Sequence, residues 1–252
     1  MSPTRVVEEA APAAGVASAP GADAKRPFIQ RLFTDIAPRY DWFNRLASLG
    51  LDQRWRARTV QEVGVAPGQR VLDVCAGTGD LALLCAQRQA GEGMVVGLDM
   101  NGTMLAYAQR KQRVRQLQVG WLQADAQVLP FAEGSFDRLV IGFSTRNLSD
   151  LTTALREMLR VLRPGGRLAI LETGRPAHPV VRAGHLVFLF TVARAIGWLL
   201  TGRAWPFTYL ARSVRQFLTP EEVVDRLTSL GAQTRYVPLS WGLASLYLAV
   251  KP

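Results

Sequence analysis

Short apolar segments that alternate with helical segments restrict the fold of this 252-residue sequence more than any other feature. The apolar segments read RVLDVCA, GMVVGLDM, VGWLQAD, FDRLVIGFS and RLAILET, and stretches such as DLALLCAQRQ and LTTALREMLRVL lie between them. Parallel strands need long crossover connections, usually helices, so we expect a doubly wound, mostly parallel α/β sheet covered on both faces. Two further strands, QTRYVPLS and LASLYLAV, are close in sequence. They predict an antiparallel C-terminal edge and bring the sheet to seven strands.

The chain is expected to divide into a tail and one domain. The tail is rich in Ala, Pro and Gly and has no aromatic residue, so we expect it to be disordered; it also lacks the pattern of a secretory signal. Two helical segments outside the sheet pattern are expected to act as lids. The predicted parts are a tail at 1–26 and a domain at 27–252, comprising a lid at 27–66, a cofactor-binding core at 67–175, an inserted apolar lid at 176–218, and a C-terminal helix with edge strands at 219–252.

Charge and cysteine content restrict the partners and the compartment. The net charge is +10, mostly from arginine, and 48% of the residues are apolar, enough for a proper core. This charge fits an anionic membrane surface, nucleic acid, or no partner at all, and it says nothing about the fold. Cys75 and Cys85 are the only cysteines, and their placement argues against a disulfide and favours a reducing cytosol.

A glycine turn follows the first strand, in VLDVCAGTGD from Val71 to Asp80. A dinucleotide-binding fingerprint would continue G-x-G-x-x-G and place a pyrophosphate on the helix start. Here the third glycine is absent and Asp80, a carboxylate, begins the helix. This argues against NAD and favours a ligand with an amino group and a sulfonium, which describes S-adenosylmethionine.

Two more acids end the next strands. Asp99 lies 22 residues after Gly77, where a carboxylate accepts both ribose hydroxyls. Asp125 ends the following strand, where a carboxylate or backbone amide commonly meets the adenine amino group. The alternative is that Asp80 and Asp99 only cap helices. Three strand-end signals in order favour the cofactor site.

Several longer segments resemble a known family. FTDIAPRYDWFNRLASLGLDQRWR, VLDVCAGTGD, DMNGTML, ADAQVLPFAEGSFD, FSTRNLSD and LRPGGRLAILE occur in order and are similar to the ubiquinone/menaquinone biosynthesis C-methyltransferases. The resemblance covers about residues 28–251, and the IAPRYDWFN and RNLSD segments are its most specific parts. It implies a class I, Rossmann-like methyltransferase fold. The implied activity is S-adenosylmethionine-dependent methylation of demethylmenaquinol or a related polyprenyl quinol.

The same resemblance places the family's cofactor contacts on Thr78, Asp99, Asp125 and Ala126 of this chain. Gly142 stands where the family often has serine. Other departures from the family pattern cluster on the substrate side. They are FSTRN in place of FGLRN, ETGRP in place of EFSKP, and a terminal WGLASLYLAVK that lacks the family's histidine. No metal is expected. The expected cofactor-binding residues are Asp73, Ala76, Gly77, Thr78, Gly79, Asp99, Met100, Asp125, Ala126 and Gly142.

The expected catalytic residues are Arg146, Asn147 and Tyr40. The first two follow the strand LVIGF, at the edge where such folds bind ligands, and Arg146 would stabilise or orient a phenolate. The alternatives are an ion pair of Arg146 with Asp150, and lid packing for Tyr40. Other candidates are Glu172, as a base or as a support for the TGRP turn, the two histidines, His178 and His185, and, on segment alone, Tyr209 and Arg212.

The stretch LVFLFTVARAIGWLL, Leu186 to Leu200, is apolar except for a narrow stripe of Thr191, Arg194, Gly197 and Thr201. Its 15 residues are too short and too charged for a membrane span of about 20 apolar residues. Such a helix lines a core or lies in a membrane interface, and both remain open. The lipophilic quinol favours peripheral contact of a cytoplasmic protein with the inner membrane surface. Oligomeric state is not fixed by the sequence.

Four other function classes were weighed against quinol methylation. Another hydrophobic aromatic or isoprenoid acceptor fits the substrate-side departures. Nucleic acid is not expected as a partner, because GFSTRN replaces the Pro-Pro-aromatic motif that grips a flipped base. A non-catalytic cofactor-binding protein stays open because no base is unmistakable. An NAD-dependent oxidoreductase lacks its third glycine.

Overall fold

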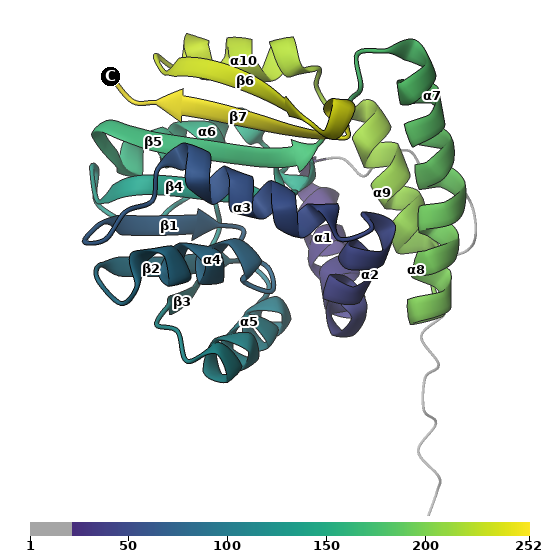
Figure 1. Cartoon of the computed structure of the whole chain (residues 1–252), viewed down its shortest axis with the longest axis horizontal. Helices are drawn as coiled ribbons and strands as arrows, with labels where there is room; N and C mark the ends of the chain where they lie inside the picture. Colours follow the sequence, from purple (N-terminus) through teal and green to yellow (C-terminus); the bar gives the residue numbers. More distant parts are fainter. Residues whose placement is uncertain (1–21) are drawn as a thin grey trace, which may run out of the picture.

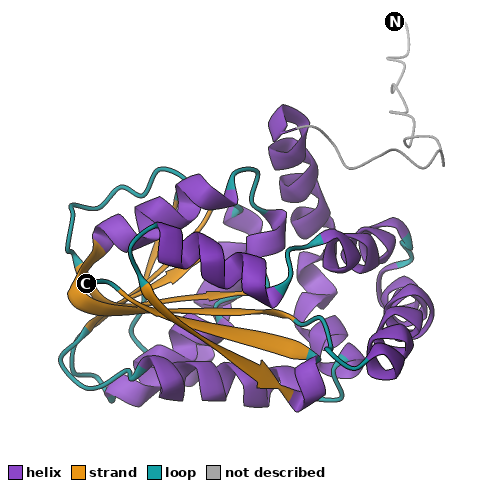
Figure 2. Cartoon of the chain, turned by 90° about the horizontal axis from the view of Figure 1, so that it is seen from above, coloured by secondary structure: helices purple, strands orange, loops and turns teal. Residues whose placement is uncertain are grey.

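The computed structural model describes residues 22–252 and has a sheet with helices on both faces and a helical layer at one end (Figures 1 and 2). The strands follow the order β3-β2-β1-β4-β5-β7-β6, in which β7 is antiparallel to both of its neighbours. This confirms the predicted fold class. The strands are β1 (Arg70–Val74), β2 (Met94–Asp99), β3 (Gly120–Gln123), β4 (Phe136–Gly142), β5 (Leu162–Thr173), β6 (Gln233–Leu239) and β7 (Ala244–Val250).

The helices fall into sheet-covering and end-capping groups. Those that cover the sheet are α3 (Leu51–Val63), α4 (Asp80–Gln89), α5 (Gly102–Arg115), α6 (Leu151–Val161) and α10 (Pro220–Ser229). Those of the end layer are α1 (Ala22–Ile36), η1 (Ala37–Arg39), α2 (Tyr40–Ala47), α7 (Pro179–Phe188), η3 (Leu189–Ala193), α8 (Arg194–Thr201) and α9 (Trp205–Gln216). Short turns η2 (Thr145–Asn147) and η4 (Ser240–Gly242) complete the chain.

Successive side chains of each strand point to opposite faces of the sheet, so the apolar core has two parts, one on each face. Val71 of β1 packs with α3 and α4 on one face, while Leu72 and Val74 pack with α6 and α10 on the other. Val74 lies beside Leu98 of β2 and Ile141 of β4, so the residues that follow these three strands emerge at one edge. The strand register therefore gathers the predicted site residues.

Local sequence signals set several helix ends. Asn101 caps α5 by accepting from the Met104 N–H, and Thr219 forms a reciprocal capping box with Glu222 before α10. Two boundaries differ from expectation. Helix α1 begins at Ala22, so residues 22–26, which we expected in the tail, are helical, while residues 1–21 lie outside the described part. Strand β5 begins at Leu162, five residues before the segment RLAILET, and its register against β4 shifts within this extension.

The two lid segments pack against each other although they are distant in sequence. Leu32 and Phe43 of the N-terminal helices form one apolar cluster with Leu189, Phe207 and their neighbours in the inserted helices. Figure 1 shows these helices stacked beside the sheet end, whereas α3 lies across the sheet face. The end layer therefore consists of α1, α2 and α7 to α9.

The inserted helix is longer than the sequence predicted. Helix Pro179–Thr201 is continuous over 23 residues, and within residues 22–252 it is the one helix long and apolar enough to cross a membrane. A π-helical turn at Leu189–Ala193 rotates the later residues around the axis. The expected polar stripe is therefore broken: Arg194 is exposed, but Gly197 is buried against the Phe207 ring.

Candidate active site

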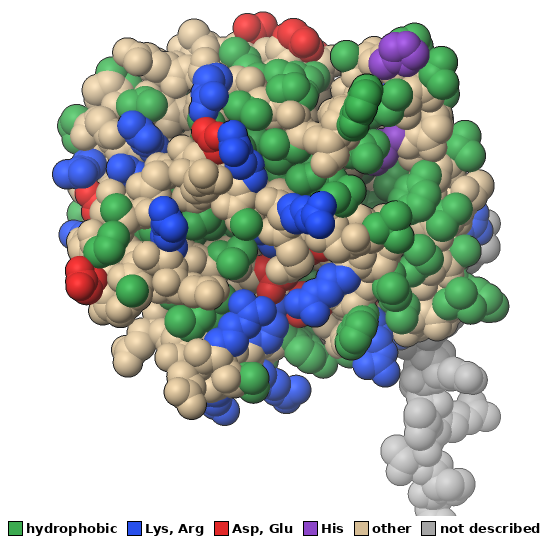
Figure 3. All heavy atoms as spheres, viewed as in Figure 1, with side chains coloured by type: hydrophobic (Ala, Val, Ile, Leu, Met, Phe, Trp, Pro, Cys, Tyr) green, Lys and Arg blue, Asp and Glu red, His purple; other side chains and the backbone are tan. Residues whose placement is uncertain are grey.

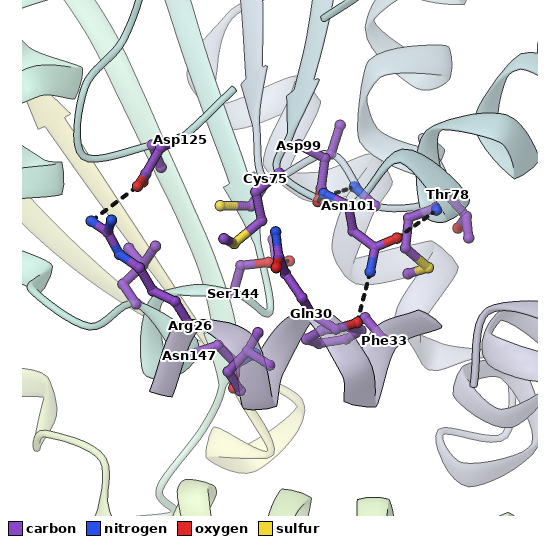
Figure 4. Close-up of a pocket in the computed structure, with 18 of the residues that line it drawn as sticks. Arg26, Gln30, Phe33, Cys75, Thr78, Asp99, Asn101, Asp125, Ser144 and Asn147 are labelled. Carbon is purple, nitrogen blue, oxygen red and sulfur yellow. Dashed lines mark hydrogen bonds and ion pairs between the residues drawn. The ribbon is translucent and has the colours of Figure 1, made fainter. Parts of the chain in front are cut away.

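A pocket of about 860 Å³, open to solvent, lies between α1 and the carboxyl ends of β1, β2 and β4. The strand order reverses at β1 and β4, which is where open α/β sheets bind ligands. Figure 4 shows side chains from α1 and from the strand ends pointing into this space. Eight of the ten expected cofactor residues line it, namely Ala76, Gly77, Thr78, Asp99, Met100, Asp125, Ala126 and Gly142.

The two glycines of the turn have different tasks. Gly77 has a φ of +56° and donates its N–H to Asp99 Oδ2 at 2.8 Å, so it presents backbone to the pocket. Gly79 does not line the pocket. A Cβ there would lie 2.6 Å from the Trp121 ring and 2.9 Å from Ala108 Cβ. Gly79 therefore permits close packing of the turn against Trp121 of β3 and Ala108 of α5.

Asp99 is held by the backbone at both carboxylate oxygens. Oδ2 accepts from Gly77, and Oδ1 accepts from the Asn101 N–H at 2.8 Å (Figure 4). Burial raises the pKa of Asp99, and the backbone donors oppose this. Each oxygen keeps lone-pair capacity toward the pocket, which suits a pair of adjacent hydroxyls.

Asp125 lies at the opposite end of the pocket under α1. Its Oδ1 accepts from the Gln127 N–H at 2.9 Å, and its Oδ2 pairs with Arg26 of α1 at 2.9 Å. Lys25 of α1 also donates to the Leu148 carbonyl at 2.6 Å. Helix α1 is thus tied across the pocket at its N-terminal turns.

Charged side chains cluster at the start of α4. Lys111 donates to Asp80 at 2.6 Å and to Asp41 at 2.9 Å, and buried Arg56 lies 3.8 Å from Asp80 and 3.7 Å from Asp52. Burial alone would raise the pKa of Asp80, but Arg56 and Lys111 hold it at about 2. Asp80 is therefore already paired, which weakens the argument that its lone charge excludes a pyrophosphate. Three carboxylates against two cations still leave the cluster negative, which suits an ammonium or sulfonium group.

Asp73 is the other expected residue that does not line the pocket. It is buried below α4, where Oδ2 accepts from the Ala82 N–H at 2.9 Å and Oδ1 has no partner. Burial raises its pKa to about 8, against the smaller opposing effects of the Ala82 N–H and Arg56. Asp73 therefore supports the helix start as a neutral acid at pH 7.

Asp73→Asn is expected to flatten the dependence of stability on pH. Folded protein keeps the Asp73 proton up to about pH 8, whereas an unfolded Asp releases it near pH 4. The contribution of Asp73 to stability is therefore fully present below about pH 4 and is lost by ~1.4 kcal/mol per pH unit up to about pH 8. Urea unfolding at pH 5 and pH 8 should show a larger loss for the parent than for the variant. Equal losses would contradict the buried neutral acid.

A second, larger cavity of about 1560 Å³ adjoins the first, between α1–α3 and α7–α9. Its walls are mainly aromatic and aliphatic, with Phe43, Trp55, Phe188 and Phe207 among them. Figure 3 shows hydrophobic side chains gathered over α7 and α8, on the side of the molecule formed by the end layer. Phe33, Tyr40 and Asn147 line both spaces, so the two spaces meet at these residues.

Of the three expected catalytic residues, Tyr40 and Asn147 lie where this cavity meets the pocket, and Arg146 lines the cavity only. Arg146 is ion-paired with buried Glu172, not with Asp150, which instead caps α6 by accepting from the Thr153 N–H. Asn147 Oδ1 accepts from the Tyr209 hydroxyl at 3.2 Å. Burial raises the pKa of Tyr40, so its phenol stays protonated at neutral pH. The sequence missed Glu172 as the partner because it is 26 residues away, on the neighbouring strand β5.

The remaining candidates separate by position. Tyr209 and His185 line the apolar cavity, whereas His178 is exposed before α7 and Arg212 lines neither space. Glu172 accepts from Thr145 and Thr173 as well as from Arg146, so its carboxylate is fully used. Among the described residues no group of His, Cys, Asp or Glu could hold a metal.

Several residues of the site carried no sequence signal that we used. Arg26, Gln30 and Phe33 reach the pocket from α1, Arg56 reaches it from α3, and Lys111 belongs to the charged cluster from α5. The helical periodicity of these segments indicates which face is apolar, but it does not show which cation meets which acid. Cys75 and Cys85 are both free.

Comparisons with known proteins show the family of this chain. The model of the ubiE/COQ5 methyltransferase family matches residues 21–251. The demethylmenaquinone methyltransferase of Thermus thermophilus is 41% identical over 221 residues, covering 88% of this chain and 100% of that protein. The ubiquinone/menaquinone biosynthesis C-methyltransferase UbiE of Shewanella woodyi is 34% identical, covering 91% and 92%.

A solved structure supports the fold. A SAM dependent methyltransferase from Aquifex aeolicus is 20% identical, covers 78% of this chain and 89% of its own, and superimposes with a TM-score of 0.59. With the family model spanning nearly all described residues, the chain belongs to the ubiE/COQ5 methyltransferase family and is a methyltransferase.

Proposed function

We propose that this enzyme transfers the methyl group of S-adenosylmethionine to a ring carbon of a polyprenylated quinol in respiratory quinone biosynthesis. The acceptor is demethylmenaquinol, giving menaquinol, or the related ubiquinone precursor. The observation that carries the proposal is the meeting, at Tyr40 and Asn147, of the pocket that holds Asp99 and Asp125 with a larger apolar cavity. Relatives over nearly the whole chain are named for this chemistry.

The cofactor's parts match groups along the pocket. Asp99 accepts the ribose hydroxyls, and Asp125 with Ala126 meets the adenine. Thr78 and Met100, which also line the pocket, lie beside the ribose and the sulfonium. The carboxylate of the cofactor goes to Arg56, whose buried Nε has no partner and which lies too far from Asp52 and Asp80 for good hydrogen bonds. The negative cluster around Asp80 takes the ammonium group.

Transfer then needs an acceptor ring at the junction of the two spaces. The ring carbon must face the sulfonium methyl in line, and holding both reactants supplies much of the rate enhancement. Tyr40 and Asn147 lie at that junction and position the ring. Arg146, beside it, donates a hydrogen bond from its free Nε–H to a ring oxygen and so helps to hold the ring.

A methyl-transfer assay tests this function. Purified protein receives labelled S-adenosylmethionine and chemically reduced demethylmenaquinone in detergent. Label in the quinone ring is the expected result. Cofactor binding without transfer would contradict the quinol as acceptor, and a panel of hydrophobic aromatic and isoprenoid acceptors would then identify the second candidate, which the departures FSTRN and ETGRP favour.

We also propose that the protein works in the cytoplasm and contacts the inner membrane surface through the outer side of helix Pro179–Thr201. Trp198, Leu199 and Val187 are 55%, 75% and 62% exposed there, while the opposite side packs on α9. The exposed Arg194 adds charge for anionic lipid. Because the apolar cavity lies behind this helix, a lipid-dissolved acceptor has a short path to the site.

Leu199→Glu is expected to weaken binding to vesicles of phosphatidylglycerol and phosphatidylethanolamine at least about tenfold, since burying one Leu contributes ~1.5–3 kcal/mol. Val114→Glu is the matched control, because Val114 is 85% exposed on α5. Flotation with vesicles measures both. Equal binding of the two variants would contradict the proposed membrane face.

A further inference from the structure

Three buried polar atoms of the apolar cavity have no hydrogen-bond partner. They are Asn44 Nδ2 on α2, Arg146 Nε after β4, and His185 Nε2 on α7. Within the described residues only six such side-chain atoms occur, and half of them belong to residues that line this one cavity. A buried polar atom left unpaired costs ~1–3 kcal/mol, and such atoms mark places where a ligand completes the bonding.

The three atoms define what kind of ligand fits. Asn44 Nδ2 and Arg146 Nε are donors, so they require an oxygen acceptor. The imidazole Nε2 accepts a hydrogen bond in the tautomer that carries its proton on Nδ1. Burial lowers the pKa of His185, so the ring is neutral at pH 7. The cavity therefore suits an apolar ring that carries one oxygen acceptor and one hydroxyl donor.

The other titratable groups of the cavity are not free to take a proton. Tyr40 stays protonated because burial raises its pKa. Asp52 is already bonded by Ser48 at 3.0 Å and by Gln53 at 2.8 Å. Burial also raises the pKa of Tyr209, and Arg146 is a cation already paired with Glu172. Among the titratable groups of the cavity, His185 is the one whose nitrogen, Nε2, is free to accept a proton.

We propose that His185 is the proton acceptor of the quinol, with Asn44 and Arg146 holding the oxygen at the far side of the ring. This inference rests on the proposed function. The quinol O–H bond breaks and its proton passes to Nε2. The electron pair moves through the ring, the ring carbon bonds to the methyl carbon, and the S–CH₃ bond breaks with its electrons going to sulfur. His185 then returns its proton to the oxygen as the ring C–H proton leaves to water, so one proton is released overall.

His185→Gln tests the step, because glutamine retains a polar side chain but cannot take up a proton. We expect kcat with reduced demethylmenaquinone to fall about 100-fold or more, within the range for general bases, while the affinity for S-adenosylhomocysteine stays within about twofold of the parent, as expected for a group outside the cofactor pocket. The loss of kcat should become smaller as pH rises, because hydroxide then removes the quinol proton in place of the missing base.

His178→Gln is the matched control, since His178 is exposed on the same segment. Equal kcat in the two variants would overturn the inference.

A binding measurement separates this inference from the proposed function. The chain has only two histidines, so the imidazole ¹⁵N resonances of untagged protein resolve them. The probe is 4-methoxy-1-naphthol, which has one hydroxyl and one ether oxygen on opposite sides of the ring. We expect its binding to shift the Nε2 resonance of His185 and to leave His178 unchanged. An unshifted His185 at saturating probe overturns the inference, whereas a shift without methyl transfer to the quinol contradicts the proposed acceptor alone.

Discussion

Asp99→Asn is expected to weaken cofactor binding about 100-fold, because hydrogen bonds to a charged acceptor contribute ~1.5–3 kcal/mol. The carboxylate serves the ribose hydroxyls and, at the same time, receives the Gly77 and Asn101 N–H groups. An amide of the same shape can accept through only one of its two atoms, and its NH₂ opposes one of these donors. Both the ribose contact and the turn that carries the methionine end are therefore weakened. Calorimetric titration with S-adenosylhomocysteine measures the change.

Asp225→Asn is the control for loss of a carboxylate, since Asp225 is exposed on α10 and lies in neither cavity. Its dissociation constant should match that of the parent. The Asp99 variant should also bind ligands that keep both ribose hydroxyls only slightly more tightly than it binds their 2′-deoxy analogues. Similar affinities of the two aspartate variants would show that the ribose does not lie at β2.

The strand-end acids were predictable because a parallel sheet brings them together by construction. Once β1, β2 and β4 are adjacent, their register fixes Asp99, the glycine turn and Gly142 at one edge. The period of apolar residues and the caps at Asn101 and Thr219 then set the helices between them. Local sequence was sufficient for this half of the site.

The partners of the charged groups were not predictable in the same way. Arg146 has Asp150 four positions away, yet it pairs with Glu172 across the sheet, since Asp150 is used by the N-terminus of α6. Asp80 looked like an unpaired acid because Lys111 and Arg56 approach it from other helices. Ion pairing depends on which side chains fold into one space, and periodicity does not contain that information.

The lid layer was recognised as helical, but its packing was missed for a similar reason. A π-turn adds a residue between Leu189 and Ala193 and so displaces every later side chain around the helix. Gly197, which we expected on the polar stripe, is the point where Phe207 approaches; a Cβ there would lie 2.2 Å from that ring. The extra residue of a π-turn leaves no sign in the sequence of a helix that is apolar on nearly every side.

Glu172→Gln is expected to lower the free energy of unfolding by about 3–5 kcal/mol, as happens when one partner of a buried ion pair is removed. Glu172 is 1% exposed, and it accepts from Thr145, Thr173 and Arg146, so the change leaves a buried guanidinium without its counter-ion. For a domain of this size the melting temperature should fall by roughly 10 °C. Glu133→Gln is the control, since its partner Lys251 is 3.4 Å away and the Glu133 side chain is 75% exposed. That change should cost less than about 1 kcal/mol.

Adding Arg146→Met to the Glu172→Gln variant separates support of the fold from catalysis. The double variant buries no unpaired charge, so it should recover much of the lost stability. Methyl transfer should stay about 10- to 100-fold below the parent, because a hydrogen bond from a charged donor contributes ~1.5–3 kcal/mol. Recovery of both would mean that Arg146 serves only the fold. Stability without activity would mean that methyl transfer needs the Arg146 guanidinium, which Glu172 holds in place.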